Sequence, residues 1–179
     1  PWSESVADVI AYFNYLEGGV CQKINRLSQR EWIRRFFSVI SRLGDGGGWA
    51  ILGVAMIIVQ GRPALASIVQ MIATCLVGIA LYKFLKNRLV RERPYINHGG
   101  ILCGAAPLDR YSFPSGHTLH AFSFAIMMSH FEPLLLPVVV PFALLVAASR
   151  VILGLHYPSD VIVGAAIGAA LAMTSITLF

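Results

Sequence analysis

Five stretches of the sequence, each 16 to 21 residues long, contain no Asp, Glu, Lys or Arg, and they limit the possible folds more than any other feature. A helix needs about 20 residues to cross the roughly 30 Å apolar core of a bilayer, with about 17 residues as the lower limit. Four stretches reach that limit, whereas the first has 16 residues and contains three consecutive glycines. The stretches are residues 46–61, 63–82, 111–131, 133–149 and 161–179. The pattern predicts a bundle of membrane-spanning helices.

The composition supports this interpretation and excludes several classes of protein. Of the 179 residues, 56% are hydrophobic and only 13% are charged, and the mean hydropathy is +0.69. A soluble domain carries about 25% charged residues, and a chain of this length is too short to enclose five apolar helices in a soluble core. We therefore expect an all-α, polytopic membrane helix bundle with about five transmembrane helices, six being the alternative. We place it in a membrane and expect no nucleic-acid partner, despite the net charge of +5.

Residues 1–44 follow a different pattern from the rest of the chain. Apolar residues recur there at the i, i+3, i+4, i+7 spacing of an amphipathic helix, with basic residues between them. The apolar residues are Val6, Val9, Ile10 and Phe13 in one segment and Ile33, Phe36, Phe37 and Ile40 in another. Such helices lie in the membrane interface and are attracted to anionic headgroups, while packing against the bundle is the alternative. We predict interfacial helices at 1–44 and a transmembrane core at 45–179.

The basic residues are distributed very unequally between the two ends of the predicted bundle. With five spans, the connections at 83–110 and 150–160 emerge on the same side of the membrane as residues 1–45. This side, here called face X, then holds thirteen of the fourteen Lys and Arg residues, and only Arg62 lies on the other side. A charged end is most often a solvated surface, so the asymmetry alone does not identify a functional site.

Three polar clusters from separate parts of the sequence reach face X. The first runs from Lys86 to Arg93 and Pro94. By itself, such a cluster is typical of a juxtamembrane basic patch that contacts lipid headgroups. A functional interpretation therefore depends on the other two clusters.

The second cluster is Pro114, Ser115, Gly116 and His117, at the start of the third apolar stretch. Ser115 can cap a helix there, and the free N–H groups that follow attract anions. Gly116 leaves space for a ligand to approach the backbone, and His117 would lie beside such a ligand. Ordinary helix capping explains the same residues equally well when they are taken alone.

The third cluster contains Ser149 and Arg150, followed by His156 and Asp160. A carboxylate four residues after a histidine can accept the Nδ1–H of the ring and leave Nε2 free as a nucleophile or base. A charged loop with Asp160 as a helix cap is the alternative. Together, however, the clusters supply cations, a helix start and two histidines, a set of groups suited to an oxyanion ester.

With these motifs the sequence resembles the type 2 phosphatidic acid phosphatase superfamily of membrane lipid phosphatases. The signature of that family is Lys, six residues, Arg-Pro; then Pro-Ser-Gly-His; then Ser-Arg, five residues, His, three residues, Asp. All three motifs occur here in order and at the correct spacing, from Lys86 to Asp160. Many bacterial members carry an additional N-terminal span, for which residues 1–44 offer no good candidate.

The resemblance implies a metal-independent phosphatase with a histidine nucleophile and no cofactor. His156 would attack phosphorus and form a phosphohistidine, with Asp160 holding its ring, and His117 would protonate the leaving oxygen and then activate water. The residues that would bind the phosphate are Lys86, Arg93, Ser115, Gly116 and Arg150. The expected partners are the bilayer and a lipid substrate, with no obligate protein partner.

The substrate is then a lipid phosphate or diphosphate, such as undecaprenyl diphosphate, phosphatidylglycerol phosphate or phosphatidic acid. A lipid phosphotransferase of the same superfamily would share the first half of the reaction and is the first alternative. A non-catalytic protein that binds anionic lipids is the second alternative, although the presence of both histidines and of Asp160 disfavours it.

Two arguments about the orientation of face X conflict. The excess of basic residues places it in the cytoplasm, whereas the resemblance to bacterial lipid phosphatases implies an active site that faces the periplasm. We expect the periplasmic orientation, because phosphate binding and headgroup contacts account for part of the charge. Cys21 and Cys103 both belong to face X, and we expect no disulfide between them. Cys75 lies within an apolar stretch and is expected to act as a small hydrophobic residue.

Overall fold

The computed structural model describes residues 2–107 and 109–179, and within these ranges its regular elements are helices, with one isolated β-bridge between Glu92 and Tyr111. The long helices are α1 (Trp2–Asn25), α2 (Glu31–Arg42), α3 (Gly48–Gln60), α4 (Pro63–Arg88), α6 (Gly116–Phe131), α7 (Leu136–Ile152) and α8 (Pro158–Leu178). A single helical turn, α5 (Pro94–Asn97), lies between α4 and α6. The all-α prediction is confirmed.

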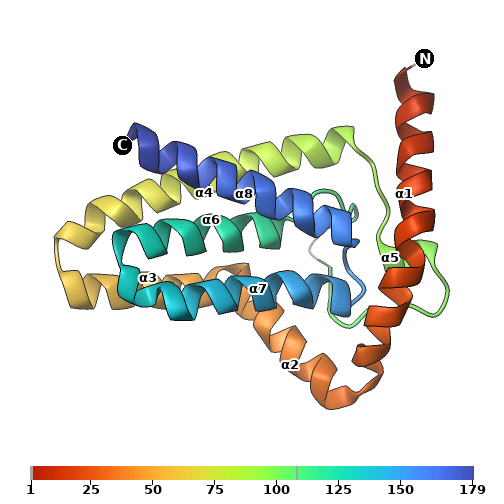
Figure 1. Cartoon of the computed structure of the whole chain (residues 1–179), viewed down its shortest axis with the longest axis horizontal. Coiled ribbons are helices and arrows are strands. Elements are labelled where there is room, and N and C mark those ends of the chain that lie inside the picture. The colour runs from red at the N-terminus through yellow and green to blue at the C-terminus, as the bar shows by residue number, and fades with distance from the viewer. Residues whose placement is uncertain (1, 108) are drawn as a thin grey trace.

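Five of the helices form a bundle, and two lie at one of its ends. Figure 1 shows α3, α4, α6, α7 and α8 running along the long axis, with α1 crossing one end of the bundle and α2 inclined to α3. The turns from α3 to α4 and from α6 to α7 lie at the opposite end. Helix α6 is central and packs against α4, α7 and α8. The connections that carry the polar motifs therefore lie at the same end as α1 and α2.

Within the part of the chain that the structure describes, four helical segments are long and apolar enough to cross a membrane, so the chain is a multi-pass membrane protein. They are Glu31–Gln60, Pro63–Arg88, Pro133–Ile152 and Pro158–Leu178. The stretch 111–131 forms only the 16-residue helix α6, because residues 111–115 precede the helix and Ser115 caps it. Since 16 residues fall short of the usual span length, the fifth predicted span stays a prediction.

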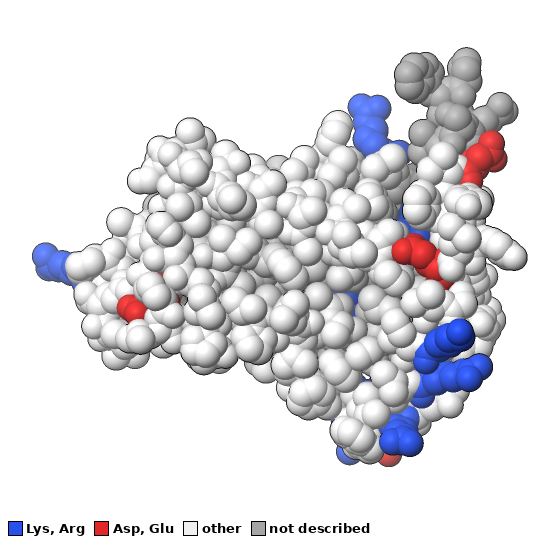
Figure 2. Space-filling model, viewed as in Figure 1, with Lys and Arg blue, Asp and Glu red and all other residues white. Residues whose placement is uncertain are grey.

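The surface charges follow the same division. On the face seen in Figure 2, the middle of the bundle is largely free of charged side chains, which are concentrated at the end formed by α1 and α2, with few at the opposite tip. Such a surface is what a helix bundle presents to the apolar core of a bilayer.

The N-terminal helices only partly follow the predicted amphipathic pattern. In α1, Val9 and Phe13 are exposed, and the side chains of Val6 and Ile10 lie outside the described residues. In α2, Ile33 is buried and Ile40 packs against the main core, while Phe36 is exposed. Helix α2 therefore buries part of its apolar face against the bundle. The interfacial position of 1–44 stays a prediction.

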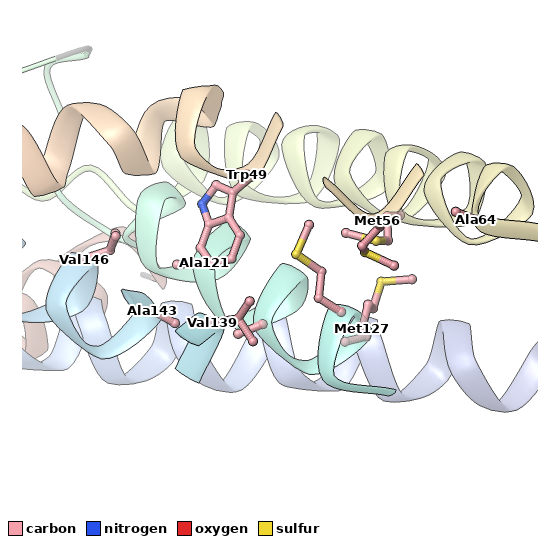
Figure 3. Close-up of a cluster of buried hydrophobic side chains, with 12 residues drawn as sticks. Trp49, Met56, Ala64, Ala121, Met127, Val139, Ala143 and Val146 are labelled. Atoms are coloured by element: carbon pink, nitrogen blue, oxygen red, sulfur yellow. The ribbon is translucent and has the colours of Figure 1, made fainter. Parts of the chain in front are cut away.

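The core is built from small and flexible apolar residues of the bundle helices. Figure 3 shows Trp49 and Met56 of α3 near Ala121 and Met127 of α6, with the Val139 side chain of α7 close by. Small residues let the helices approach closely.

The closest approach joins α6 to α8 and positions the polar clusters. A Cβ added to Gly164 would lie 2.6 Å from the carbonyl oxygen of Ser115, and one added to Gly168 would clash with the carbonyl oxygen of Leu119. The Ser115 amide also donates to the carbonyl oxygen of Asp160 at 3.1 Å. The glycines thus bring the start of α8, with its aspartate, directly against the start of α6.

The beginning of α3 differs from the predicted first span. The stretch 46–61 was expected to be a single apolar segment, but the helix begins at Gly48 and residues 43–47 form a wide turn that joins it to α2. Gly46 has φ +128°, a backbone conformation that side-chain-bearing residues rarely adopt. Gly46 and Gly47 therefore belong to a junction between two helices, and this junction lies inside the candidate span Glu31–Gln60.

Candidate active site

The three polar clusters meet at one cavity of about 520 Å³ at the end of the bundle near α2. Six of the eight predicted site residues line it, namely Lys86, Arg93, Gly116, His117, Arg150 and His156. Asp160 lies behind His156, and Ser115 is fully buried at the helix cap. The sequence stretches that were predicted to share one face therefore do share one site.

His156 lies in the turn between α7 and α8, and the contacts of its ring define its protonation. An Arg93 guanidinium N–H donates to Nε2 at 3.2 Å. Because a guanidinium only donates, Nε2 carries the lone pair and the ring proton is on Nδ1. Nδ1 lies 3.6 Å from a carboxylate oxygen of Asp160. The separation is longer than a hydrogen bond, yet the nitrogen faces the expected carboxylate.

The surroundings of His156 keep its ring neutral. Burial, followed by the positive charges of Arg93 and Arg150, holds the pKa of His156 well below its ordinary value. A neutral imidazole with a free Nε2 lone pair is the form that can act as a nucleophile.

Asp160 is held by a residue that the sequence analysis did not assign to the site. Arg91 donates to Asp160 at 2.6 Å and to Glu17 of α1 at 2.7 Å, and its guanidinium stacks on the Tyr157 ring at 3.9 Å. The Tyr157 amide donates to the other oxygen of Asp160 at 2.8 Å. Residues 90–93 follow α4 without helical structure, so Arg91 and Arg93 share one side of an extended segment. The two-residue spacing between Arg91 and the predicted site residue Arg93 could therefore have indicated Arg91 from the sequence.

Lys86 and Arg93 meet on Asp109, a carboxylate that was not among the predicted site residues. The Lys86 ammonium donates to Asp109 at 2.6 Å and the Arg93 guanidinium donates to its other oxygen at 2.8 Å. Burial raises the pKa of Asp109, but the hydrogen bond and charge of Lys86, together with those of Arg93, outweigh it and hold the pKa below its ordinary value. In this structure Asp109 thus forms ion pairs with two cations that were predicted to bind phosphate. Asp109 lies in a loop without periodicity, so nothing in the sequence indicated it.

Arg150 lies in the last turn of α7 and lines the cavity. It is 2% exposed, and it donates to the Ser41 hydroxyl of α2. Its Nε has no hydrogen-bond partner among the described residues. A buried guanidinium with an unused donor is suited to an anionic ligand.

The start of α6 supplies the remaining predicted residues. The Ser115 hydroxyl caps the helix and bonds to the Thr118 hydroxyl at 2.9 Å, so the structure uses this side chain within the helix end. A Cβ added to Gly116 would meet only the Tyr82 ring at 3.6 Å, an ordinary contact. Packing therefore does not require glycine at this position, which faces the cavity.

His117 contacts another carboxylate that was not predicted, Asp45, which comes from the junction between α2 and α3. Nε2 of His117 and an oxygen of Asp45 form an ion-pair contact. Nothing in the sequence indicated Asp45 as a site residue, because no motif spacing relates residue 45 to residue 117. The cavity therefore contains two histidines, and a carboxylate faces each of them.

Away from the histidines and cations, the cavity is apolar and is lined by α3, α4 and α6. Its lining residues include Trp49, Ile57, Ile68, Met71, Phe124 and Met128. Among the described residues, no three His, Cys, Asp or Glu side chains are placed to hold a metal ion. The three cysteines, Cys21, Cys75 and Cys103, are free thiols.

Comparison with known proteins identifies the family of this site. The sequence profile of the PAP2 superfamily matches residues 67–179, which contain all three motifs. The chain belongs to the PAP2 superfamily. The resemblance inferred from the motifs is thereby confirmed for this PAP2 protein.

Several bacterial proteins are similar to this PAP2 chain in sequence. A decaprenylphosphoryl-5-phosphoribose phosphatase of Mycobacterium tuberculosis is 37% identical over 124 residues, which cover 68% of this chain and 66% of that protein. A lipid A 1-phosphatase of Rhizobium johnstonii is 32% identical over 103 residues, which cover 55% of this chain and 42% of that protein. The chain thus spans just under two thirds of the mycobacterial relative.

Solved structures show the same fold. The crystal structure of Aquifex aeolicus LpxE has a TM-score of 0.78 and 29% identity, and the match covers 90% of this chain and 95% of that one. A PAP2-type phosphatidylglycerolphosphate phosphatase from Bacillus subtilis has a TM-score of 0.67 and 21% identity, covering 97% of this chain and 94% of that one. The arrangement of the helices is therefore that of a transmembrane PAP2 protein.

Proposed function

We propose that this PAP2 protein is a membrane lipid phosphatase that hydrolyses a lipid phosphate or diphosphate through a phosphohistidine intermediate. The observation that carries the proposal is the composition of one cavity, which has histidines and cations at one end and apolar side chains of α3, α4 and α6 along the rest. The cations suit a phosphate group, and the apolar part suits the chain of a lipid. A soluble phosphate ester would leave that apolar part unfilled.

In the first half-reaction, Nε2 of His156 attacks phosphorus, a P–N bond forms and the P–O bond to the lipid breaks. Nε2 becomes available when Arg93, which donates to it in this structure, turns to the phosphate oxygens. Asp160 faces the Nδ1 proton and stabilises the positive charge that the ring gains. His117 gives its proton to the leaving lipid oxygen.

In the second half-reaction, a water molecule loses a proton to His117 and attacks phosphorus. The P–N bond breaks, inorganic phosphate leaves and His156 returns to its neutral form. Lys86, Arg93 and Arg150 stabilise the charge on the phosphoryl oxygens, together with N–H groups at the start of α6. The proposed mechanism uses no metal ion or cofactor.

The relatives suggest which lipids to test first. Their names describe phosphatases of decaprenylphosphoryl-5-phosphoribose and of lipid A. We therefore include a polyprenyl-linked sugar phosphate and lipid A in the panel, beside undecaprenyl diphosphate, phosphatidylglycerol phosphate and phosphatidic acid.

The decisive experiment is release of inorganic phosphate from this panel by purified protein in detergent. We expect release from at least one lipid, an unchanged rate in the presence of a chelator, and competitive inhibition by vanadate, which adopts the geometry of the transferring phosphoryl group. A protein that releases phosphate from none of these lipids would overturn the proposal. Loss of lipid phosphate without inorganic phosphate, with label in a second lipid, would indicate the phosphotransferase.

We further propose that face X is periplasmic in the inner membrane, and Cys103 allows a direct test. Cys103 is exposed, whereas Cys21 is buried and Cys75 is half-buried. Burial, and then the charges of Glu17 and Asp160, raises the pKa of Cys21 to about 12, so that thiol is unreactive. A membrane-impermeant thiol reagent should modify Cys103 in intact cells, and a Cys103→Ser variant should remain unlabelled. Protection of Cys103 until lysis would place face X in the cytoplasm.

A further inference from the structure

Asp45 reaches the active site from outside the part of the chain that carries the family motifs. It lies in the turn at residues 43–47 between α2 and α3, upstream of the segment 67–179 that matches the PAP2 profile. Its carboxylate contacts Nε2 of His117, and the residue lines the cavity. None of the roles assigned to the three motifs involves this residue.

The turn that carries Asp45 is held in place by packing. A Cβ added to Gly44 would lie 2.9 Å from both γ-carbons of Val146 in α7, and one added to Gly48 would lie 3.0 Å from the carbonyl oxygen of Leu43. Gly46 supplies the positive φ that the turn requires. The two ends of the turn, at Gly44 and Gly48, are therefore closely packed, and Asp45 lies between them.

The charges around His117 explain why a carboxylate is needed there. The ring is almost buried, with 10% of its side chain exposed, and it shares the cavity with Lys86, Arg93, Arg150 and His156. His120 of α6, Tyr82 of α4 and the carboxylate of Asp109, which Lys86 and Arg93 hold, line the same cavity. Desolvation and nearby positive charges both disfavour a protonated imidazole. Among the described residues, Asp45 is the carboxylate that contacts this ring.

We propose that Asp45 is a positioning residue that orients His117 and stabilises the protonated form of its ring in the first half-reaction. The inference rests on the proposed phosphatase function. Because Asp45 occupies Nε2, the proton that reaches the leaving oxygen comes from Nδ1. After transfer the ring is neutral, with Nε2–H still donating to Asp45, and Nδ1 can accept a proton from the attacking water. The carboxylate itself stays ionised throughout, as the buried aspartate of a Ser-His-Asp triad does.

The role can be tested through the leaving group. A lipid alkoxide is a poor leaving group that needs a proton, whereas nitrophenolate leaves without one. We expect Asp45→Asn to lower kcat by about 10- to 100-fold on the lipid phosphate, less than the roughly 10²–10⁴-fold that general acid catalysis contributes in full. We expect it to change kcat on nitrophenyl phosphate by less than about threefold. Asp8→Asn, the same change at an exposed position of α1, is the matched control and should behave like the parent protein.

Two further variants keep the test conclusive. Asp45→Glu retains the carboxylate and should recover part of the lost activity on the lipid phosphate, which also covers the case in which Asp45→Asn does not fold. His117→Ala should show the same dependence on the leaving group, and adding Asp45→Asn to it should cause no further loss, because both act through one group.

The possible outcomes separate this inference from the proposed function. Equal losses on both substrates would mean that Asp45 only supports the structure, and unchanged kcat on the lipid would mean that it has no role; either result overturns the inference while leaving the phosphatase intact. If the parent protein releases phosphate from neither substrate, the proposed function fails first.

Discussion

The two histidines of the cavity meet their carboxylates in different ways. His156 and Asp160 are four residues apart and belong to one turn and the helix that follows it, whereas His117 and Asp45 come from α6 and from the distant junction of α2 and α3. Asp160 is fully buried and is also held by Arg91 and the Tyr157 amide. Asp45 is partly exposed. One pair is therefore part of a local, rigid unit, and the other depends on how two regions of the molecule pack together.

The largest expected effect comes from removing the nucleophile of the local pair. His156→Ala should lower phosphate release by about 10⁴-fold or more, since no other group near the phosphate replaces the attacking nitrogen. His117→Ala should lose less, about 10²–10⁴-fold on a lipid. The measurement is single-turnover phosphate release by each purified variant. Near-parental activity in His156→Ala would remove the covalent mechanism.

Replacing each carboxylate with its amide compares the roles of Asp160 and Asp45 directly. Asp160→Asn should lower kcat by about 10³-fold on every substrate, because the wrong tautomer of His156 is then favoured. It should also lower the apparent unfolding temperature in detergent by several degrees, since Arg91 loses a buried partner. Asp45→Asn, at a partly exposed site, should unfold close to the parental temperature. Equal thermal losses in the two variants would show that the pairs are equally structural.

A smaller effect is expected from replacing Asp109, whose carboxylate forms ion pairs with Lys86 and Arg93. Asp109→Asn should leave Lys86 and Arg93 free for phosphate and lower the inhibition constant of vanadate by roughly three- to tenfold, because an internal competitor is weakened. We expect little change in kcat. A titration of activity against vanadate measures the effect, and a higher inhibition constant would show that Asp109 instead keeps the cations in place.

The smallest expected effect is the dependence of activity on acidic pH. The lowered pKa of His156 means that its ring stays neutral and nucleophilic below the ordinary histidine value of about 6.5. Between pH 7 and pH 6, kcat/KM should therefore fall by less than about twofold, whereas an ordinary histidine would lose about threefold. A pH profile of kcat/KM gives the answer, and a steep fall above pH 6 would contradict the buried position of the nucleophile.

Much of the fold was predictable because bilayer thickness imposes a simple rule on sequence. Stretches without charged residues correspond to α3, α4, α6, α7 and α8, although the rule misplaced the ends of α3 and α6. At α3, Gly46 and Gly47 belong to the junction with α2, and at α6 residues 111–115 precede the helix. In both cases an apolar composition is compatible with helix and with turn alike, and only packing selects between them.

The motif residues were predictable for a related reason, since their spacing is local. The interval between His156 and Asp160 places the carboxylate behind the ring whatever the rest of the chain does. The sequence by itself therefore determined the membrane bundle, the three motifs and the residues proposed for phosphate transfer.

The other charged residues around those motifs are brought there by tertiary packing and could not be predicted from the sequence. Arg91, Asp109 and Asp45 reach the site through an extended segment, a loop and a glycine-rich turn, and none of these carries a repeating pattern. The contact between Asp45 and His117 joins residues far apart in the sequence, and it exists because α2, α6 and α7 pack at one end of the bundle. A pairing of this kind is set by the packing of helices in three dimensions, which no local spacing in the sequence records.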